Sequence, residues 1–283
     1  MIYIILSIIC SIIVSVMLKL AKRYMIDVKQ AIAWNYAMAI LLTWIVYHPQ
    51  FENFDQAPWL IYGSLGVLLP VIFWAIAASV RHTGIVRTDV AQRLSLFIPL
   101  TAAFLLFGEN ISTPKAIGII LGFLAIICAI PLKDNIQKKE TGSWIYLLLV
   151  FLGMGIIDVL FKQVALFKAV PYTSSLFVIY VLAFLISVIF LAYLFISKTS
   201  KFSWINMLCG WLLGLFNFGN ILFYLKAHQA EAARPSLVFT AMNIGVIALG
   251  SLVGLLIFRE KLSILNKAAI AIAIIAILVI SFA

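Results

Sequence analysis

Charged residues are scarce in this chain, and their scarcity excludes whole classes of protein. Of its 283 residues, only 11% are charged and 65% are hydrophobic. A soluble globular chain is about a quarter charged and about half apolar, because polar groups must cover much of a folded surface. The composition therefore excludes a water-soluble enzyme and a disordered chain, and it indicates a polytopic membrane protein.

Cysteine and histidine are too few to suggest a metal or redox centre. Each occurs three times, and Cys10, Cys128 and Cys209 all lie within apolar runs without a CxxC pair. Such cysteines are typical of small buried hydrophobes. HExxH, P-loop and paired acidic motifs are also missing. We therefore predict no metal, no cofactor and no catalytic residue, which disfavours an intramembrane lipid-modifying enzyme.

Acidic residues are half as numerous as basic ones, 10 against 20, and the net charge is +10. Most basic residues flank apolar runs, where anionic lipid headgroups and the orientation of the chain account for them. No nucleic-acid-binding motif is present. The expected partners are therefore membrane lipid and a small-molecule substrate, not nucleic acid. A monomer and a homodimer both remain open.

Long polar stretches are absent, and apolar runs fill the chain. Ten runs approach the length of about 20 residues that a helix needs to cross a hydrocarbon core of about 30 Å. Helices are predicted because a spanning backbone must satisfy its own hydrogen bonds. The predicted spans are 2–20, 31–47, 59–80, 88–107, 114–131, 144–167, 172–196, 204–225, 234–258 and 262–282. We expect an all-α, multi-pass protein of a bacterial inner or cell membrane.

The basic residues divide unevenly between the two sides of this bundle. Fifteen lie at the connections between spans 1–2, 3–4, 5–6, 7–8 and 9–10, and five lie on the opposite side. Cytoplasmic loops carry the excess of lysine and arginine. The count therefore predicts that both termini lie outside the cytoplasm.

The two halves of the chain repeat one another. Residues 1–24 align with 144–167, and Phe107–Ser112 aligns with Phe258–Ser263. Each copy holds five predicted spans, an odd number, so the copies must face opposite ways in the membrane. Inverted repeats are common in secondary transporters. We therefore predict two inverted five-helix units, 1–131 and 144–283, joined by the loop 132–143.

These features resemble a known family. Both halves contain a Phe-x-Glu-x-(Ile/Leu)-Ser step, the first span contains Lys19, and the stretch Leu94–Leu100 ends in Pro99 and Leu100, where the second half has Gly250. The pattern is similar to that of EamA-type transporters of the drug/metabolite transporter superfamily. The resemblance implies a ten-helix secondary transporter of a small metabolite, amino acid or drug that uses no ATP. It also implies that both termini lie in the cytoplasm, against the basic-residue count.

One predicted span carries an acidic and a basic residue on one face. Asp158 and Lys162 are four residues apart, and an acid that precedes a base by four residues favours an ion pair. Lys19 is the repeat counterpart of Lys162. Ionisable groups inside a membrane mark a pathway or a packing contact. These three residues are candidates for the substrate pathway, and Asp158 is the candidate proton-coupling group.

Amides, hydroxyls and aromatic groups form further candidates. The eighth span places Asn217, Asn220, Tyr224 and His228 on one stripe. Gln92 of the fourth span and Asn243 of the ninth occupy equivalent repeat positions. The remaining pathway candidates are Asn35, Tyr36 and Trp74. Such groups either face a solute pathway or join helices by hydrogen bonds.

Glu109 and Glu260 close the fourth and ninth spans, where a structural capping role is favoured over substrate contact. Asp89 and Arg93 favour a local ion pair rather than a gate. Together the residues predict a transporter that works by alternating access. Proton coupling and exchange are both open, and a channel-like or structural membrane protein is the alternative.

Overall fold

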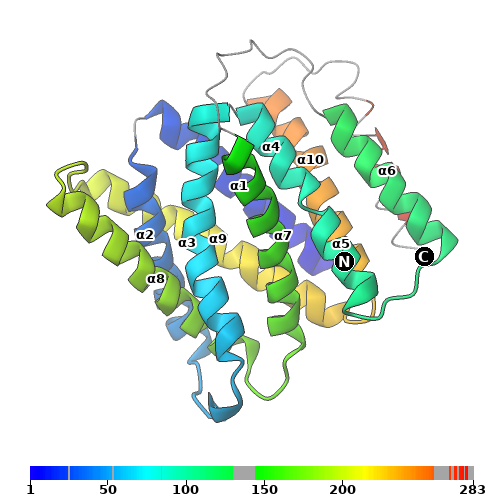
Figure 1. Cartoon of the computed structure of the whole chain (residues 1–283), viewed down its shortest axis with the longest axis horizontal. Helices are drawn as coiled ribbons and strands as arrows, with labels where there is room; N and C mark the ends of the chain where they lie inside the picture. Colours follow the sequence, from blue (N-terminus) through cyan, green and yellow to red (C-terminus); the bar gives the residue numbers. More distant parts are fainter. Residues whose placement is uncertain are drawn as a thin grey trace.

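The computed structural model describes residues 1–24, 26–52, 54–83, 85–129 and 144–257, with isolated positions beyond Ile257. This part of the chain is all-α (Figure 1). Its helices are α1 (Ile2–Arg23), α2 (Val28–Tyr47), α3 (Trp59–Thr83), α4 (Ile85–Leu94), α5 (Phe97–Leu105), α6 (Thr113–Ala129), α7 (Trp144–Leu166), α8 (Tyr172–Ile196), α9 (Trp204–Ala230) and α10 (Pro235–Ile257), with a 3-10 turn, η1, at Phe54–Gln56.

Nine of the ten predicted spans coincide with described helices, and the tenth, 262–282, lies largely outside the described residues. The fourth span is divided into α4 and α5. Pro99 has no N–H and its ring would clash with the carbonyl of Ser95, four residues earlier. That carbonyl accepts a hydrogen bond from the Ile98 amide at 3.0 Å instead. The prediction of one continuous helix over 88–107 was therefore wrong.

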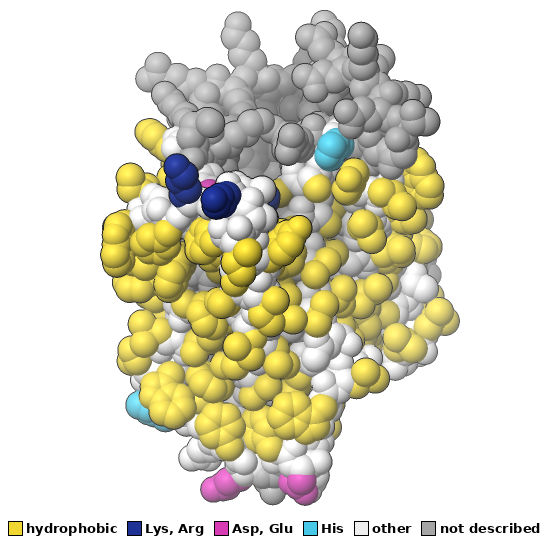
Figure 2. Space-filling model, turned by 60° about the vertical axis from the view of Figure 1, so that its left-hand side comes forward, with side chains coloured by type: hydrophobic (Ala, Val, Ile, Leu, Met, Phe, Trp, Pro, Cys, Tyr) yellow, Lys and Arg dark blue, Asp and Glu magenta, His cyan; other side chains and the backbone are white. Residues whose placement is uncertain are grey.

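The outer surface is that of a membrane protein. Five described helices, α2, α3, α7, α8 and α9, are long and apolar enough to cross a membrane. Figure 2 shows hydrophobic side chains over the middle of the visible face and charged ones near its ends. Ile196 is 82% exposed and Leu60 is 86% exposed, an arrangement that suits lipid. The protein is a multi-pass integral membrane protein.

Helices from the first half of the chain pack against helices from the second half. α2 contacts α8 and α9, and α3 contacts α7 and α8. α1 packs against α9 and α10, whereas α4 and α5 pack against α7 (Figure 1). One hydrophobic core therefore runs through both halves.

Two glycines of α9 bring its backbone close to the backbone of α2. A Cβ atom added at Gly210 would lie 2.5 Å from the carbonyl oxygen of Ala31, and one added at Gly214 would lie 2.5 Å from that of Asn35. Small residues four apart allow two helices to pack backbone against backbone in a membrane. The α2–α9 contact therefore depends on the absence of side chains at these positions.

Side-chain contacts show which helix ends share one end of the bundle. The Lys226 Nζ near the end of α9 lies 5.8 Å from the ring centroids of Tyr3, at the start of α1, and Tyr47, at the end of α2. The Trp44 ring of α2 packs on Phe177 of α8, with centroids 5.7 Å apart. α2 therefore ends where α8 begins, so the two helices run antiparallel.

Candidate functional site

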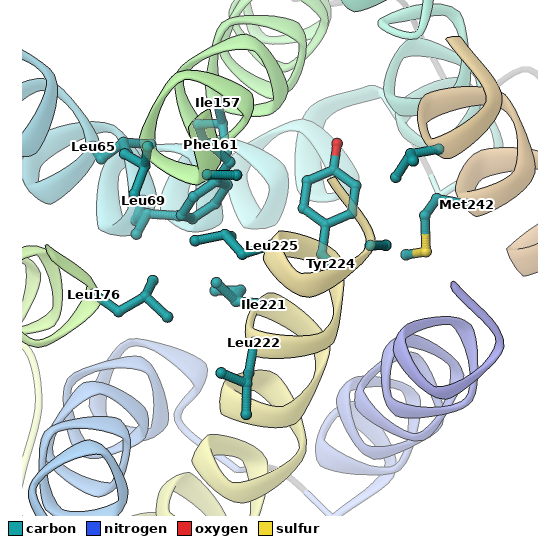
Figure 3. Packing of buried hydrophobic residues seen from close by; sticks show 14 of the residues in the cluster. Leu65, Leu69, Ile157, Phe161, Leu176, Ile221, Leu222, Tyr224, Leu225 and Met242 are labelled. Atoms are coloured by element: carbon teal, nitrogen blue, oxygen red, sulfur yellow. The ribbon is translucent and has the colours of Figure 1, made fainter. Parts of the chain in front are cut away.

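Tyr224 of α9 lies in the middle of the buried cluster (Figure 3). Its ring meets Phe161 of α7 edge to face, with centroids 6.4 Å apart. In the view of Figure 3, Met242 lies on the other side of the ring and the hydroxyl points away from Leu222. The tyrosine thus presents a polar group inside the helix bundle.

The hydroxyl of Tyr224 donates a hydrogen bond of 2.9 Å to Oδ1 of Asp158. Asp158 is partly exposed and lies about 21 Å from the start of α7, about two-thirds of the way along that helix. Its second oxygen, Oδ2, accepts no hydrogen bond from the described residues. One carboxyl oxygen is therefore hydrogen-bonded to Tyr224, and the other is available to a ligand or a proton.

The ion pair predicted between Asp158 and Lys162 is not formed, and that prediction was wrong. Lys162 is fully buried, and its Nζ donates to the carbonyl oxygens of His228 at 3.3 Å and Ala232 at 3.1 Å. Carbonyls at the end of a helix lack partners within the helix and attract a cation. The Lys162 ammonium group therefore binds the carbonyls at and just beyond the end of α9, and not the Asp158 carboxylate that the sequence spacing suggested.

Glu109 performs the capping role that the sequence predicts, but it does so for α10. Its carboxylate accepts hydrogen bonds from the Ser236 amide at 2.8 Å and the Ser236 hydroxyl at 2.5 Å. Lys115 forms a salt bridge of 3.1 Å with the same carboxylate. A carboxylate at the start of a helix is favoured by the unpaired amides there. Its repeat counterpart, Glu260, lies outside the described residues.

The polar stripe of the eighth predicted span faces the interior, but each member meets a different helix. Asn217 Nδ2 donates to Asn35 Oδ1 of α2 at 3.1 Å. Ser7 of α1 donates its hydroxyl to Asn220 Oδ1 at 2.7 Å. In this conformation both asparagines join helices, and a role in the solute pathway stays a prediction.

His228, the last member of the stripe, is fully buried. Among the described residues, neither ring nitrogen has a hydrogen-bond partner. The imidazole packs against the rings of Tyr224, at 4.6 Å between centroids, and Phe239, at 4.7 Å. This histidine continues the polar line that begins at Asp158.

The other candidates are more dispersed. Gln92 is partly exposed, and Asn243 Nδ2 donates to the Phe239 carbonyl of its own helix at 3.1 Å, so no hydrogen bond joins this pair. The Trp74 ring packs on Phe190, with centroids 4.1 Å apart. The side chains of Lys19 and Asp89 lie outside the described residues.

Tyr36 of α2 is fully buried, and so is Tyr180 of α8, which the sequence did not single out. The signal that could have found Tyr180 is the repeat, because both tyrosines are the ninth residue of their helices. Ser7 gave no such signal, since its role depends on the neighbouring helix. Among the described residues, no group of three or more histidine, cysteine or acidic side chains is placed to hold a metal.

Comparisons with known proteins agree with this structure. Residues 1–130 match the EamA-like transporter family. A Haemophilus influenzae protein, described only as uncharacterized, is 41% identical over 268 residues, which cover 92% of this chain and 90% of that protein. A crystal structure superposes with a TM-score of 0.68 over 98% of this chain and 96% of its own, at 14% identity, and so shares the fold.

Proposed function

The chain belongs to the EamA-like transporter family, and we propose that it carries a small polar metabolite, amino acid or drug across the membrane by alternating access. Transport uses no ATP in this proposal. Asp158 binds the cationic species of the cycle, which is either a proton or the ammonium group of the solute. Because the family is one of transporters, a small-molecule substrate is the expected partner. Transporter families are generally not enzymatic.

The observation that carries this proposal is the half-satisfied carboxyl group of Asp158. Tyr224 occupies Oδ1, whereas Oδ2 accepts no hydrogen bond from the described residues. A carboxylate within a membrane is costly unless it is paired, and such groups mark ion and substrate pathways. Lys162 is committed to the end of α9, and no ion pair to Asp158 is formed by the residues that the structure describes, so in this proposal a proton or a bound cation neutralises the carboxylate.

The packing of the helices supports the inverted repeat on which alternating access depends. The sequence pairs α1 with α7, α2 with α8, α3 with α9, and α4 and α5 with α10. If each helix is replaced by its repeat counterpart, the α2–α9 contact corresponds to α8–α3, and the α1–α9 contact corresponds to α7–α3. All four contacts are present. Two units of 1–131 and 144–283 that exchange conformations would open the shared site to each side in turn.

Transport into proteoliposomes tests this function. The purified protein is given a mixture of the twenty proteinogenic L-amino acids, with and without an imposed pH gradient, and each amino acid is measured by mass spectrometry. We expect saturable uptake without ATP that responds to the gradient. Asp158→Asn should abolish the response to pH or the uptake itself, whereas Asp55→Asn, in the exposed η1 turn, should have no effect.

Two results would contradict the proposal in different ways. Linear uptake that never saturates and shows no counterflow would favour a channel. Wild-type uptake and pH response by a folded Asp158→Asn variant would remove this carboxyl group from the mechanism.

A further inference from the structure

Two buried tyrosine hydroxyls, on α2 and α8, have no hydrogen-bond partner in the described part of the chain. Tyr36 and Tyr180 are both fully buried, and neither hydroxyl oxygen has a hydrogen-bond partner among the described residues. The two helices that carry them, α2 and α8, pack against each other. Tyr36 and Tyr180 are called the tyrosine pair below.

The tyrosine pair lies near the middle of the bundle. Each member is the ninth residue of its helix, about 12 Å from the start. Because α2 and α8 run antiparallel, with Trp44 of α2 beside Phe177 of α8, the two starts lie at opposite ends. Tyr36 and Tyr180 therefore approach the midplane from opposite sides, one from each half of the chain.

Both tyrosines lie at the level of the amides that join α2 to α9. Tyr36 follows Asn35, which accepts a hydrogen bond from Asn217. The Tyr180 ring packs on Phe218, the neighbour of Asn217, with centroids 6.4 Å apart. The tyrosine pair therefore lies at about the same depth in the bundle as these amides.

An unpartnered buried hydroxyl needs an explanation. Buried polar groups are almost always hydrogen-bonded, since an unsatisfied one loses its hydration without compensation. Phenylalanine would fill the same space without that penalty. A phenol is useful at such a position if its hydrogen-bond partner is a transported solute, which is present during only part of the transport cycle.

We propose that the hydroxyls of Tyr36 and Tyr180 bind the acceptor oxygens of the transported solute, and that this group is the carboxylate of an amino acid. A phenol donates a strong hydrogen bond to a charged oxygen. One donor from each half keeps contact with the solute while the halves exchange conformations. This inference rests on the transport function proposed above, and it extends that function from the cation to the opposite end of the solute.

The test removes only the two oxygens. Tyr36→Phe and Tyr180→Phe are reconstituted, and KM is measured for the amino acid that the wild-type protein takes up fastest from the defined mixture. We expect each variant to raise KM roughly tenfold, the loss expected for a hydrogen bond to a charged group. The melting temperature should stay the same or rise, because neither hydroxyl bonds to any residue that the structure describes.

Tyr62→Phe is the matched control. Tyr62 is equally buried, but its hydroxyl lies 2.5 Å from the Ser175 hydroxyl and is hydrogen-bonded to it. Its loss should lower the melting temperature and leave KM unchanged. A structural role for the tyrosine pair would give this same pattern at Tyr36 and Tyr180.

The possible results are distinguishable. An unchanged KM in both variants, or a lower melting temperature with an unchanged KM, overturns the inference. If KM is unchanged in both tyrosine variants while Asp158→Asn loses the pH response, the transport proposal stands and the inference falls. If the wild-type protein takes up none of the twenty amino acids, the carboxylate solute is wrong.

Discussion

The glycine contact between α2 and α9 allows a sharp test of how the two halves pack. We predict that Gly214→Ala destabilises the protein relative to Gly63→Ala. A Cβ at Gly214 would lie 2.5 Å from the Asn35 carbonyl oxygen and 2.7 Å from Met38 Cβ. Nothing lies within 4 Å of a Cβ at Gly63 of α3. Both substitutions place the same methyl group inside a helix.

The magnitude follows from the distance that the backbone must move. Ordinary contact begins at about 3.4 Å, so α9 and α2 must separate by about 0.9 Å at Gly214. A backbone carbonyl cannot rotate away as a side chain can, and overpacking of this kind costs about 1–3 kcal/mol. The gain in helix propensity from glycine to alanine, about 1 kcal/mol, is common to both variants. Their difference therefore isolates the steric cost.

The same displacement would affect the neighbouring polar contact. Asn217 lies one turn beyond Gly214, and its hydrogen bond to Asn35 measures 3.1 Å. Adding about 0.9 Å gives about 4 Å, beyond hydrogen-bond range. We expect the loss of this bond to add about 0.6 kcal/mol, the average for polar contacts between membrane helices.

Thermal unfolding of the purified protein in one detergent measures the effect. A cost of about 1–3 kcal/mol, at about 2–4 °C per kcal/mol, gives a difference of several degrees between the two variants. Gly210→Ala, which meets the Ala31 carbonyl at the same 2.5 Å, should behave like Gly214→Ala. Equal melting temperatures for Gly214→Ala and Gly63→Ala would refute the argument that a backbone contact holds these helices together.

Two further predictions concern the charges and amides around α9. Lys162→Met should lower the melting temperature and leave the response of transport to pH intact, because Lys162 holds the end of α9 and does not contact Asp158; loss of the pH response alone would contradict this. Asn35→Ala and Asn217→Ala should not be additive. The loss of unfolding free energy in the double variant should be smaller than the sum of the losses in the two single variants by about 0.6 kcal/mol, the value expected for their hydrogen bond. Strict additivity in a double-mutant cycle would show that the bond contributes nothing.

The helices could be predicted from the sequence because hydropathy alone selects the spans. Segments such as 144–167 and 172–196 agree with α7 and α8 to within one residue. The division between α4 and α5 could also have been inferred, since Pro99 lies within the predicted span 88–107. A proline alone does not establish such a break, however, because α3 continues through Pro70. A proline in an apolar run therefore signals a break without proving one.

The site was harder to predict because a sequence gives the face of a helix and not its neighbours. The stripe on α9 was correctly placed inside, but the partners of Asn217 and Asn220 on α2 and α1 depend on packing over 180 residues or more. The spacing of Asp158 and Lys162 was misleading for a related reason. Local spacing cannot reveal that the carbonyls at the end of α9 lie within reach of the lysine.

The contacts of α9 constrain how the protein can move. Near its start, Gly210 and Gly214 join it to α2 backbone to backbone, and Asn217 and Asn220 then bind α2 and α1. Near its end it meets α7 through the Tyr224–Asp158 hydrogen bond, the Tyr224–Phe161 ring contact and the carbonyls held by Lys162. A helix is stiff over this length, so α9 cannot leave α1 and α2 without exposing close-packed backbone. These contacts to α7 involve side chains, and protonation or a bound cation at Asp158 would change the hydrogen bond from Tyr224. Any opening coupled to that carboxyl group should therefore separate α7 from a block of α1, α2 and α9.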